Sequence, residues 1–501
     1  MKGDSVTRSD VAKGAGLAGL SRAGALIEAL AQPLYTWLFG IATYGLYVAL
    51  WGAVNLISNV VDLSMTSALQ RLVPGEKDEE RAHGLVKAGL LLALVPAVLV
   101  ALLVTLNAEA IASIFAAAPE DRAALPRAVA LFAWALPLWT FIEVATSAAR
   151  ARRAFGPEIR LRLFWEQIAR ILFALGFFFV GLDSLGLMVA HLCSLALTAA
   201  LCVPLLGRYY DLRRLVRAPV GAKMVRALLV SGLAILPANA ARRLLIDAPP
   251  VVLNLALAGA AGATASGLFE IARKISTIPL AVRQAFQYVM APLASAQARV
   301  DRAEIAPLYR FACRVSTALV IPLAGLLIFG GTDILSLYQG EARAALPLLW
   351  ILVSARAAEA VVGPATPIVE MTGHRVLPLV NSLIGVGVWA GLSLWLVPGQ
   401  GALGMAIAVA AATMAGTFAA TVELEMFDGL SPFDRKLWRG LLIALLGVAL
   451  MALAARWLHG PGGFAMILGL WALASWTALR FGLVRSDREA LGGLSRRLKL
   501  L

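Results

Sequence analysis

The sequence contains little that a metal-dependent or catalytic protein requires. Only three of its 501 residues are cysteine and only four are histidine. Cys193, Cys202 and Cys313 all lie in apolar stretches without a Cys-x-x-Cys pair, and the histidines lack metal-ligand spacing. No Gly-x-x-x-x-Gly-Lys-Ser/Thr motif occurs, so the chain does not hydrolyse ATP through a P-loop. We therefore expect no resident metal and no cofactor.

Charged residues are also scarce. They make up 15% of the chain, whereas apolar residues make up 60%, and the mean hydropathy is +0.81. A soluble domain carries about 25% charged residues, and stretches such as Gly89–Leu106 and Leu441–Ala454 contain none. Gly14–Phe39 lacks a cleavage site, so we expect it to be retained as a span. The pattern predicts an all-α polytopic membrane protein with about fourteen transmembrane helices.

These spans are predicted to within a few residues of the hydropathy limits. They are 13–38, 43–70, 84–106, 124–149, 158–181, 184–207, 223–257, 264–296, 303–329, 343–371, 375–397, 401–426, 436–457 and 462–483. The external loops between them reach only roughly 15–20 residues, too few for a folded catalytic domain. We expect the protein not to be an enzyme.

The net charge of +14 is distributed over alternate loops. The N-terminus, the loops 150–162 and 208–226, and the C-terminus are rich in arginine and lysine, whereas the intervening loops are short or mildly acidic. This is the positive-inside pattern of a bacterial inner-membrane protein with both termini in the cytoplasm, which requires an even number of spans. A nucleic-acid partner is not expected, because such proteins gather their charge on one soluble face.

An internal repeat occurs at an offset of roughly 220 residues, the scale of half a transporter. Three short motifs recur in the same order: Tyr44–Tyr47 as Ser266–Phe269, Ala145-Thr146 as Ala365-Thr366, and Leu185–Ala190 as Leu403–Ala408. Six spans per half make the repeat parallel. We expect two six-helix lobes at 1–222 and 223–427, followed by two C-terminal helices and a basic tail at 428–501.

Polar residues follow one face of the second and of the eighth predicted span. Because ionisable groups at membrane depth are costly, such faces are expected to line an aqueous cavity or to pair with one another. The second span carries Asn55, Asn59, Asp62 and Thr66, and the eighth carries Glu270, Lys274, Thr277, Gln284 and Tyr288. Measured from the repeated glycines, these faces are in register. We expect a common cavity, with interhelical hydrogen bonding as the alternative.

The basic residues at depth outnumber their acidic neighbours, which favours an anionic ligand, and arginine suits phosphate through its planar donor fork. The candidate ligand-binding residues are Arg22, Arg242, Arg243, Arg273, Lys274, Asn55, Asn59, Thr277 and Gln284. The carboxylates Glu28, Asp62, Glu143 and Glu166 are candidates for coupling to H+ or Na+, with structural pairing as the alternative.

Three further interpretations concern single spans. Arg162, Glu166 and Arg170 are spaced as a self-neutralising ladder, and Arg162 also suits snorkelling to the cytoplasmic surface. Arg356 and Glu359 are spaced to pair in the same way. The seventh span is too long for the bilayer, so we expect Pro250 to kink or break it.

The chain resembles the polysaccharide and oligosaccharide-lipid flippases of the multidrug/oligosaccharidyl-lipid/polysaccharide (MOP) exporter superfamily. The resemblance rests on motifs between about residues 13 and 426, and spans 13 and 14 fit the fourteen-span subgroup. These motifs are Phe39–Tyr47, Asp62–Pro74, Gly267–Phe269, Met290–Pro292, Asp333–Tyr338, Thr372–Arg375 and Val397–Gly404. The resemblance is carried by the order and spacing of these motifs along the chain.

The resemblance implies two lobes around a central cavity that faces one side of the membrane at a time. It implies as cargo a polyprenyl-diphosphate-linked oligosaccharide, moved to the periplasmic leaflet for exopolysaccharide, O-antigen or capsule biosynthesis. Polysaccharide polymerases and co-polymerases are then expected partners. An arginine in the first span is common in the family, and Arg22 stands there in this sequence. The Pro249-Pro250 pair departs from the family pattern.

Two other functions compete with this one. A cation-coupled multidrug exporter of the sister family would favour an acidic cavity with few arginines. A membrane glycan polymerase or ligase would need a large external loop with catalytic residues. Neither feature is present in the sequence.

Overall fold

The computed structural model describes residues 23–152, 159–297, 305–372 and 376–500. Within these ranges every regular element is a helix. Ten helices, or eleven if one bent pair counts as a single span, are long and apolar enough to cross a membrane. The predicted class, an all-α polytopic membrane protein, is confirmed.

The described chain forms two compact units. The first comprises Gly24–Glu270, and the second begins at Ile271 and runs to the C-terminal segment, so that the boundary falls within helix α16 (Ala260–Gln297). The sequence repeat predicts a boundary at 222/223 instead. The compact units and the repeat thus do not coincide, and the division into two repeat-related lobes stays a prediction.

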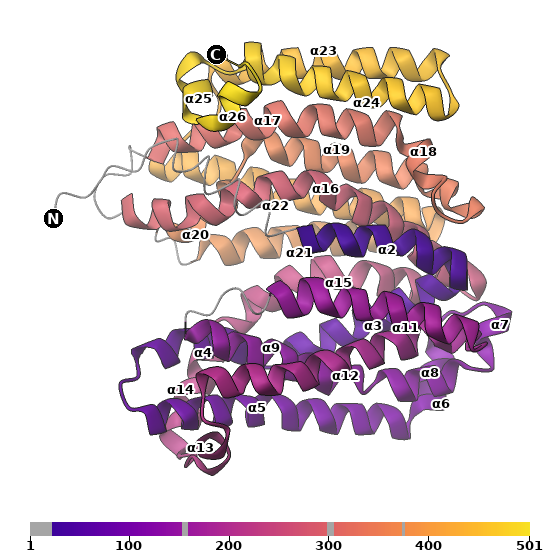
Figure 1. The fold of residues 1–501 in the computed structure, drawn as a ribbon, viewed down its shortest axis with the longest axis vertical. Coiled ribbons are helices and arrows are strands. Elements are labelled where there is room, and N and C mark those ends of the chain that lie inside the picture. Colours follow the sequence, from indigo (N-terminus) through magenta and orange to yellow (C-terminus); the bar gives the residue numbers. More distant parts are fainter. Residues whose placement is uncertain (1–22, 153–158, 298–304, 373–375, 501) are drawn as a thin grey trace. The chain divides into compact units, whose positions relative to one another are not determined.

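The first unit contains the helices up to the start of α16 (Figure 1). They are α2 (Ala23–Phe39), α3 (Ile41–Val61), α4 (Met65–Leu72), α5 (Glu79–Leu106), α6 (Ala108–Ile114), α7 (Pro119–Arg122), α8 (Leu125–Phe132), α9 (Ala135–Ala151), η2 (Ile159–Trp165), α11 (Glu166–Phe179), α12 (Asp183–Tyr209), α13 (Leu212–Arg217), α14 (Ala222–Leu233) and α15 (Leu236–Ala256), with a 3₁₀ turn at η1 (Val73–Gly75). Helix α3 packs along α15, and α9 packs against both α5 and α12.

Capping residues set several of these helix ends. Gly40 precedes α3 at a φ of 81°, a conformation that costs glycine little. The Asp78 side chain accepts a hydrogen bond from the backbone N–H of Glu80 at the start of α5. Asp211 caps α13 in the same way, and its bonds from the backbone N–H groups of Arg214 and Arg213 hold the pKa of its carboxyl below the ordinary value.

The seventh predicted span bends, but not at the predicted residue. The chain bends by 48° between α14 and α15. The break falls at residues 234–235, just before Pro237 in the first turn of α15. Pro249 and Pro250 instead lie inside α15, which continues to Ala256. Pro237 lacks the N–H that would continue α14, so the break falls where the next helix can begin with proline. The predicted break at Pro250 is therefore wrong, and a kink there stays a prediction.

The second unit is built around α17. Its helices are α17 (Ile305–Phe329), α18 (Gly331–Leu335), η4 (Gly340–Ala345), α19 (Leu346–Val362), α20 (Ala365–Met371), α21 (Leu377–Gln400), α22 (Ala402–Asp428), α23 (Arg435–Trp457), α24 (Gly460–Thr477), η5 (Ala478–Gly482), α25 (Arg485–Ala490) and α26 (Gly493–Arg497). Helix α17 packs against α19, α23 and α24, and Figure 1 shows α23 beside α24. Tyr309, Phe311 and Leu424 belong to its apolar core.

Every predicted span corresponds to helix in the described ranges. Three predicted spans fall outside the ten or eleven helices: α2 is described over only 17 residues, the fifth span is a π-helical segment followed by α11, and the eighth is the 38-residue, charge-bearing α16. The total of about fourteen spans stays a prediction.

Candidate functional site

The first unit contains a polar pocket with an excess of arginine. It has a volume of about 410 Å³ and lies where the C-terminal ends of α3 and α9 meet the N-terminal part of α15. Its lining residues are Asn59, Asp62, Ser64, Thr66, Ser67, Gln70, Glu143, Arg150, Arg162, Asn239, Arg242 and Arg243. Four arginines thus face two carboxylates, a balance that suits an anionic ligand.

Glu143 connects two of these arginines. Its Oε1 atom lies 3.3 Å from Nη2 of Arg162 and 3.6 Å from Nη2 of Arg243. Arg243 also lies 4.0 Å from Oδ2 of Asp247, one turn further along α15. The guanidinium carbon of Arg162 lies 4.4 Å from the centre of the Trp139 ring, a cation–π contact. Residues from η2, α9 and α15 are held together by these contacts.

A break between α3 and α4 shapes the pocket wall. Leu63 and Ser64 have left-handed backbones, with φ of 50° and 55°, and Oδ1 of Asp62 accepts a hydrogen bond from the Ser64 N–H at 2.9 Å. Asp62 still continues the helical face that carries Asn59, because its N–H bonds to the Ser58 carbonyl oxygen, whereas Thr66 lies beyond the turn. The predicted unbroken face of the second span is wrong, because the chain turns at residues 62–64, yet the turn brings all three side chains to the same pocket.

Five of the predicted site residues meet in this pocket: Asn59, Asp62, Glu143, Arg242 and Arg243. A sixth, Asn55, is buried one turn before Asn59, and its carbonyl oxygen accepts a hydrogen bond from Nδ2 of Asn59 at 2.7 Å. Arg242 is exposed, and within the described part of the chain it makes no hydrogen bond or ion pair.

The remaining predicted residues lie elsewhere. Arg273, Lys274 and Thr277 follow Glu270 on α16 and belong to the second unit, where Oγ1 of Thr277 donates to the Lys274 carbonyl oxygen at 2.6 Å. Arg22 and the side chains of Glu28, Gln284 and Tyr288 lie outside the described part of the chain. The cavity shared by the second and eighth spans stays a prediction.

Besides Ser64 and Ser67, four lining residues were not expected from the sequence. Arg150 and Arg162 stand in a basic loop region, and Arg162 suited a snorkelling side chain, whereas in the structure it pairs with Glu143. Gln70 donates to Oγ of Ser147 at 3.0 Å, and Asn239 donates to Oγ of Ser64 at 3.3 Å. The signal for all four is polarity close to a span end, which also marks ordinary surface residues.

No protein-family model matches this chain, and a search of curated proteins found no match. Solved structures do match it. The lipid II flippase MurJ in an inward closed conformation aligns with a TM-score of 0.71 at 12% identity, over 93% of this chain and 98% of that one. A MOP superfamily transporter from Pyrococcus furiosus aligns at 0.60 and 12% identity, over 84% and 96%. A multidrug resistance MATE transporter in an inward-facing conformation aligns at 0.59 and 16%, over 85% and 95%.

The chain has the fold of the MOP transporters. The similarity covers at least 95% of each of these three structures, so the likeness concerns whole transporters and not a shared fragment. The matched proteins are flippases and transporters and not enzymes. At these identities the likeness shows the fold alone, so the ligand must be argued from the side chains.

Two further ion pairs lie deep in the MOP fold of this chain. Arg170 donates to Glu166 at 2.5 Å, and both are buried. The predicted pairing of Glu166 with Arg170 is confirmed, while Arg162 contacts Glu143 instead. In the second unit, Oε2 of Glu359 lies 2.6 Å from Arg356, which confirms the other predicted pair.

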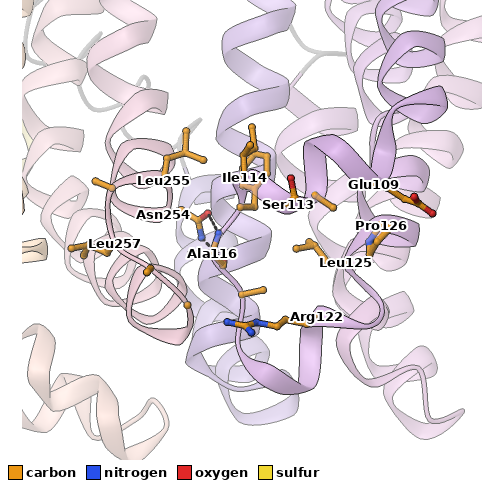
Figure 2. A pocket seen from close by; sticks show the side chains of 16 residues that line it. Glu109, Ser113, Ile114, Ala116, Arg122, Leu125, Pro126, Asn254, Leu255 and Leu257 are labelled. Carbon is orange, nitrogen blue, oxygen red and sulfur yellow. Dashed lines mark hydrogen bonds between the residues drawn. The ribbon is translucent and has the colours of Figure 1, made fainter.

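A second pocket of about 600 Å³ lies at the C-terminal end of α15, beside α6 and the start of α8. Figure 2 shows Asn254 on α15 bonded to the backbone of Ala116, with both bonds at 2.9 Å. Arg122 and Glu109 also line this pocket, so the charges balance, and its wall is otherwise mostly apolar. The arginine-rich pocket therefore remains the better candidate for an anionic ligand. Among the described residues, no three His, Cys, Asp or Glu side chains gather as a metal site.

Proposed function

We propose that this protein is a flippase that moves a polyprenyl-diphosphate-linked oligosaccharide from the cytoplasmic to the periplasmic leaflet by alternating access. The product would serve exopolysaccharide, O-antigen or capsule biosynthesis, with a polymerase and co-polymerase acting next. The observation that carries the proposal is the pocket in which Arg150, Arg162, Arg242 and Arg243 face only two carboxylates. A diphosphate presents the oxygens that arginine binds best.

The position of the pocket along the helices supports the proposal. The positive-inside pattern predicts that the C-terminal end of α3 lies on the cytoplasmic side of an inner membrane, together with both chain termini. The arginines would then meet a headgroup assembled in the cytoplasm. The matched flippase is named for lipid II, a lipid-linked substrate, and supports the same class of cargo.

A second candidate is a cation-coupled multidrug exporter. It is favoured by the structural likeness to MATE transporters and by the presence of two carboxylates, Asp62 and Glu143, in the pocket. The arginine excess argues against it, because cationic drugs would be repelled. In the Pyrococcus furiosus transporter, the reverse polarity of the binding pocket suggests a different function for that protein. That case supports judging function within this fold by the charge of the pocket.

One strain distinguishes the candidates. A deletion strain should accumulate lipid-linked oligosaccharide in the cytoplasmic leaflet and lose the polymer, and the wild-type gene should restore both. Its drug susceptibility should equal that of the parent. Normal polymer without trapped intermediate, in a strain that lacks a second flippase, would refute the flippase, and a raised drug susceptibility would favour the exporter.

A further inference from the structure

Two carboxylates in repeat-related spans each hold two arginines. Glu143 lies on α9, in the fourth predicted span, and contacts Arg162 and Arg243. Glu359 lies on α19, in the tenth, and contacts Arg356 at 2.6 Å and Arg283 at 3.4 Å. In both places a single negative charge is shared by two positive ones. The resemblance ends there, because the two carboxylates differ in how tightly they are bound.

Glu359 has the geometry of a structural ion pair. Its side chain is 1% exposed, and Oε1 also accepts a hydrogen bond from Thr417 at 3.1 Å. A buried carboxylate with short, complete bonding is costly to separate from its partners. Glu359 is therefore expected to keep these partners throughout the transport cycle.

Glu143 is bound loosely and faces a cavity. Both arginines approach the same oxygen, Oε1, at 3.3 and 3.6 Å, longer than the about 2.7–2.9 Å of a strong charge-assisted bond. The side chains of Glu143 and Arg243 are 14% and 38% exposed, and both line the pocket of about 410 Å³. Because both contacts are long and Arg243 is partly exposed, they can be exchanged for those of an incoming anion at modest cost.

We propose that Glu143 is an internal counter-anion, which occupies the arginines of the empty pocket and competes with the anionic group of the ligand for them. This inference rests on the proposed function and adds a mechanism by which the pocket would release its bound ligand. A cluster of arginines without an anion would be unstable in a partly dry pocket. A diphosphate carries more charge than one carboxylate and displaces it, and the return of Glu143 afterwards promotes release.

The two arginines have other contacts that would persist during such an exchange. The Trp139 ring lies against the guanidinium of Arg162, and Asp247 lies 4.0 Å from that of Arg243. Both guanidinium groups would therefore keep their positions while Glu143 moves away. The exchange requires rotation of one side chain and no rearrangement of the helices.

The experiment measures binding of inorganic pyrophosphate to the full-length protein in nanodiscs, for wild type, Glu143→Gln and Glu109→Gln. Glu109 is an exposed carboxylate at the other pocket, so it is a matched control. Glu143→Gln should bind pyrophosphate about three- to tenfold more tightly, because two long, partly exposed ion pairs no longer compete. The same variant should restore less polymer in the deletion strain, since release is slowed. Glu109→Gln should match wild type in both assays.

A purely structural role for Glu143 predicts the opposite sign, with binding and polymer both reduced. Equal or weaker pyrophosphate binding by folded Glu143→Gln, or no pyrophosphate binding by any variant, would overturn the proposal. Folding is checked by gel filtration, and Glu143→Asp provides a second variant that keeps the charge and should restore wild-type affinity. The gain should also disappear in Glu143→Gln/Arg243→Ala. If tighter binding is found but the deletion strain makes normal polymer, the counter-anion stands and the flippase fails.

Discussion

Gly45 on α3 and Gly267 on α16 lie backbone to backbone where the two helices cross. A Cβ atom on Gly45 would lie 2.6 Å from the backbone nitrogen of Gly267 and 1.8 Å from the carbonyl oxygen of Ala263. A Cβ on Gly267 would lie 2.5 Å from the carbonyl oxygen of Ile41. Small residues allow such approaches between membrane helices. These two glycines are the ones that recur in the sequence repeat, so repeat-related positions contact each other.

Replacing Gly45 with alanine should destabilise the first unit. The new methyl group would overlap backbone atoms, which cannot rotate away as a side chain can, and overpacking typically costs about 1–3 kcal/mol. We expect a lower midpoint of thermal unfolding in detergent, measured by tryptophan fluorescence.

Gly176→Ala is the matched control for that variant. Gly176 also lies within a helix of the first unit, and a Cβ there would meet nothing within 4 Å. Its midpoint should equal or slightly exceed that of wild type, because alanine favours helix. Equal unfolding midpoints for the Gly45 and Gly176 variants would mean that α3 and α16 can move apart to admit the methyl group without a loss of stability.

The helices themselves were predictable, because long apolar stretches are stable in a bilayer only as helices that bond their own backbone groups. The break at Leu63–Ser64 was not. The sequence Asp62-Leu63-Ser64 contains no glycine or proline, and its polar spacing suits an unbroken helix. Besides the local bond from the Ser64 N–H to Asp62, the turn packs against a distant residue, since a Cβ on Gly232 would lie only 2.2 Å from the Leu63 carbonyl oxygen. A contact between residues so far apart in sequence has no local signal.

The lining of the arginine-rich pocket was predictable only in part, and its ion pairs were not. The cost of polar groups at membrane depth singled out Asn59, Asp62, Glu143, Arg242 and Arg243, and all five line one pocket. Their partners depend on how α9, η2 and α15 pack, which spacing along one helix cannot predict. Arg162 shows this, since its i, i+4 neighbour Glu166 pairs with Arg170 while Arg162 itself contacts Glu143.

Removing Arg314 should detach the C-terminal segment from α17. Arg314 contacts Asp487 at 2.6 and 3.0 Å and Asp434 at 2.9 Å, and Asp487 is fully buried. Arg314→Met would remove this ion pair from a buried carboxylate, and breaking a buried pair costs about 3–5 kcal/mol. Limited proteolysis should cut the variant after α24 much faster than wild type.

The control for Arg314 is Arg485→Met. Arg485 pairs with Glu489 at 2.9 Å on the surface, where an ion pair contributes about 0–1 kcal/mol. Its cleavage pattern should match wild type. Protection of the C-terminal segment in Arg314→Met would show that apolar packing alone holds it.

Tyr47→Phe should destabilise the core of the first unit without changing its volume much. The Tyr47 hydroxyl lies 3.0 Å from Nδ1 of the buried His191 and 3.4 Å from Nη1 of Arg170. Its loss leaves buried polar groups without this partner, at a cost of about 1–3 kcal/mol. Tyr209→Phe is the control, since within the described residues the Tyr209 hydroxyl makes no hydrogen bond. Thermal unfolding midpoints that fall equally in both variants would assign the loss to tyrosine in general and not to this network.

Substitutions of Arg242 and Arg243 should affect pyrophosphate binding and thermal stability differently. Arg242 is exposed in the pocket without an ion pair among the described residues, so Arg242→Ala should leave the unfolding midpoint unchanged. It should nevertheless weaken pyrophosphate binding about ten- to a hundredfold, the usual effect of losing a hydrogen bond to a charged group.

Arg243→Ala should reduce pyrophosphate binding and, by releasing Glu143 and Asp247, lower the unfolding midpoint slightly. Arg243→Lys should recover only part of the affinity, because lysine keeps the charge but lacks the planar fork. Arg81→Ala, which removes an exposed pair with Asp78, should change neither quantity. Unchanged pyrophosphate binding in both pocket variants would remove the phosphate-binding role from this site.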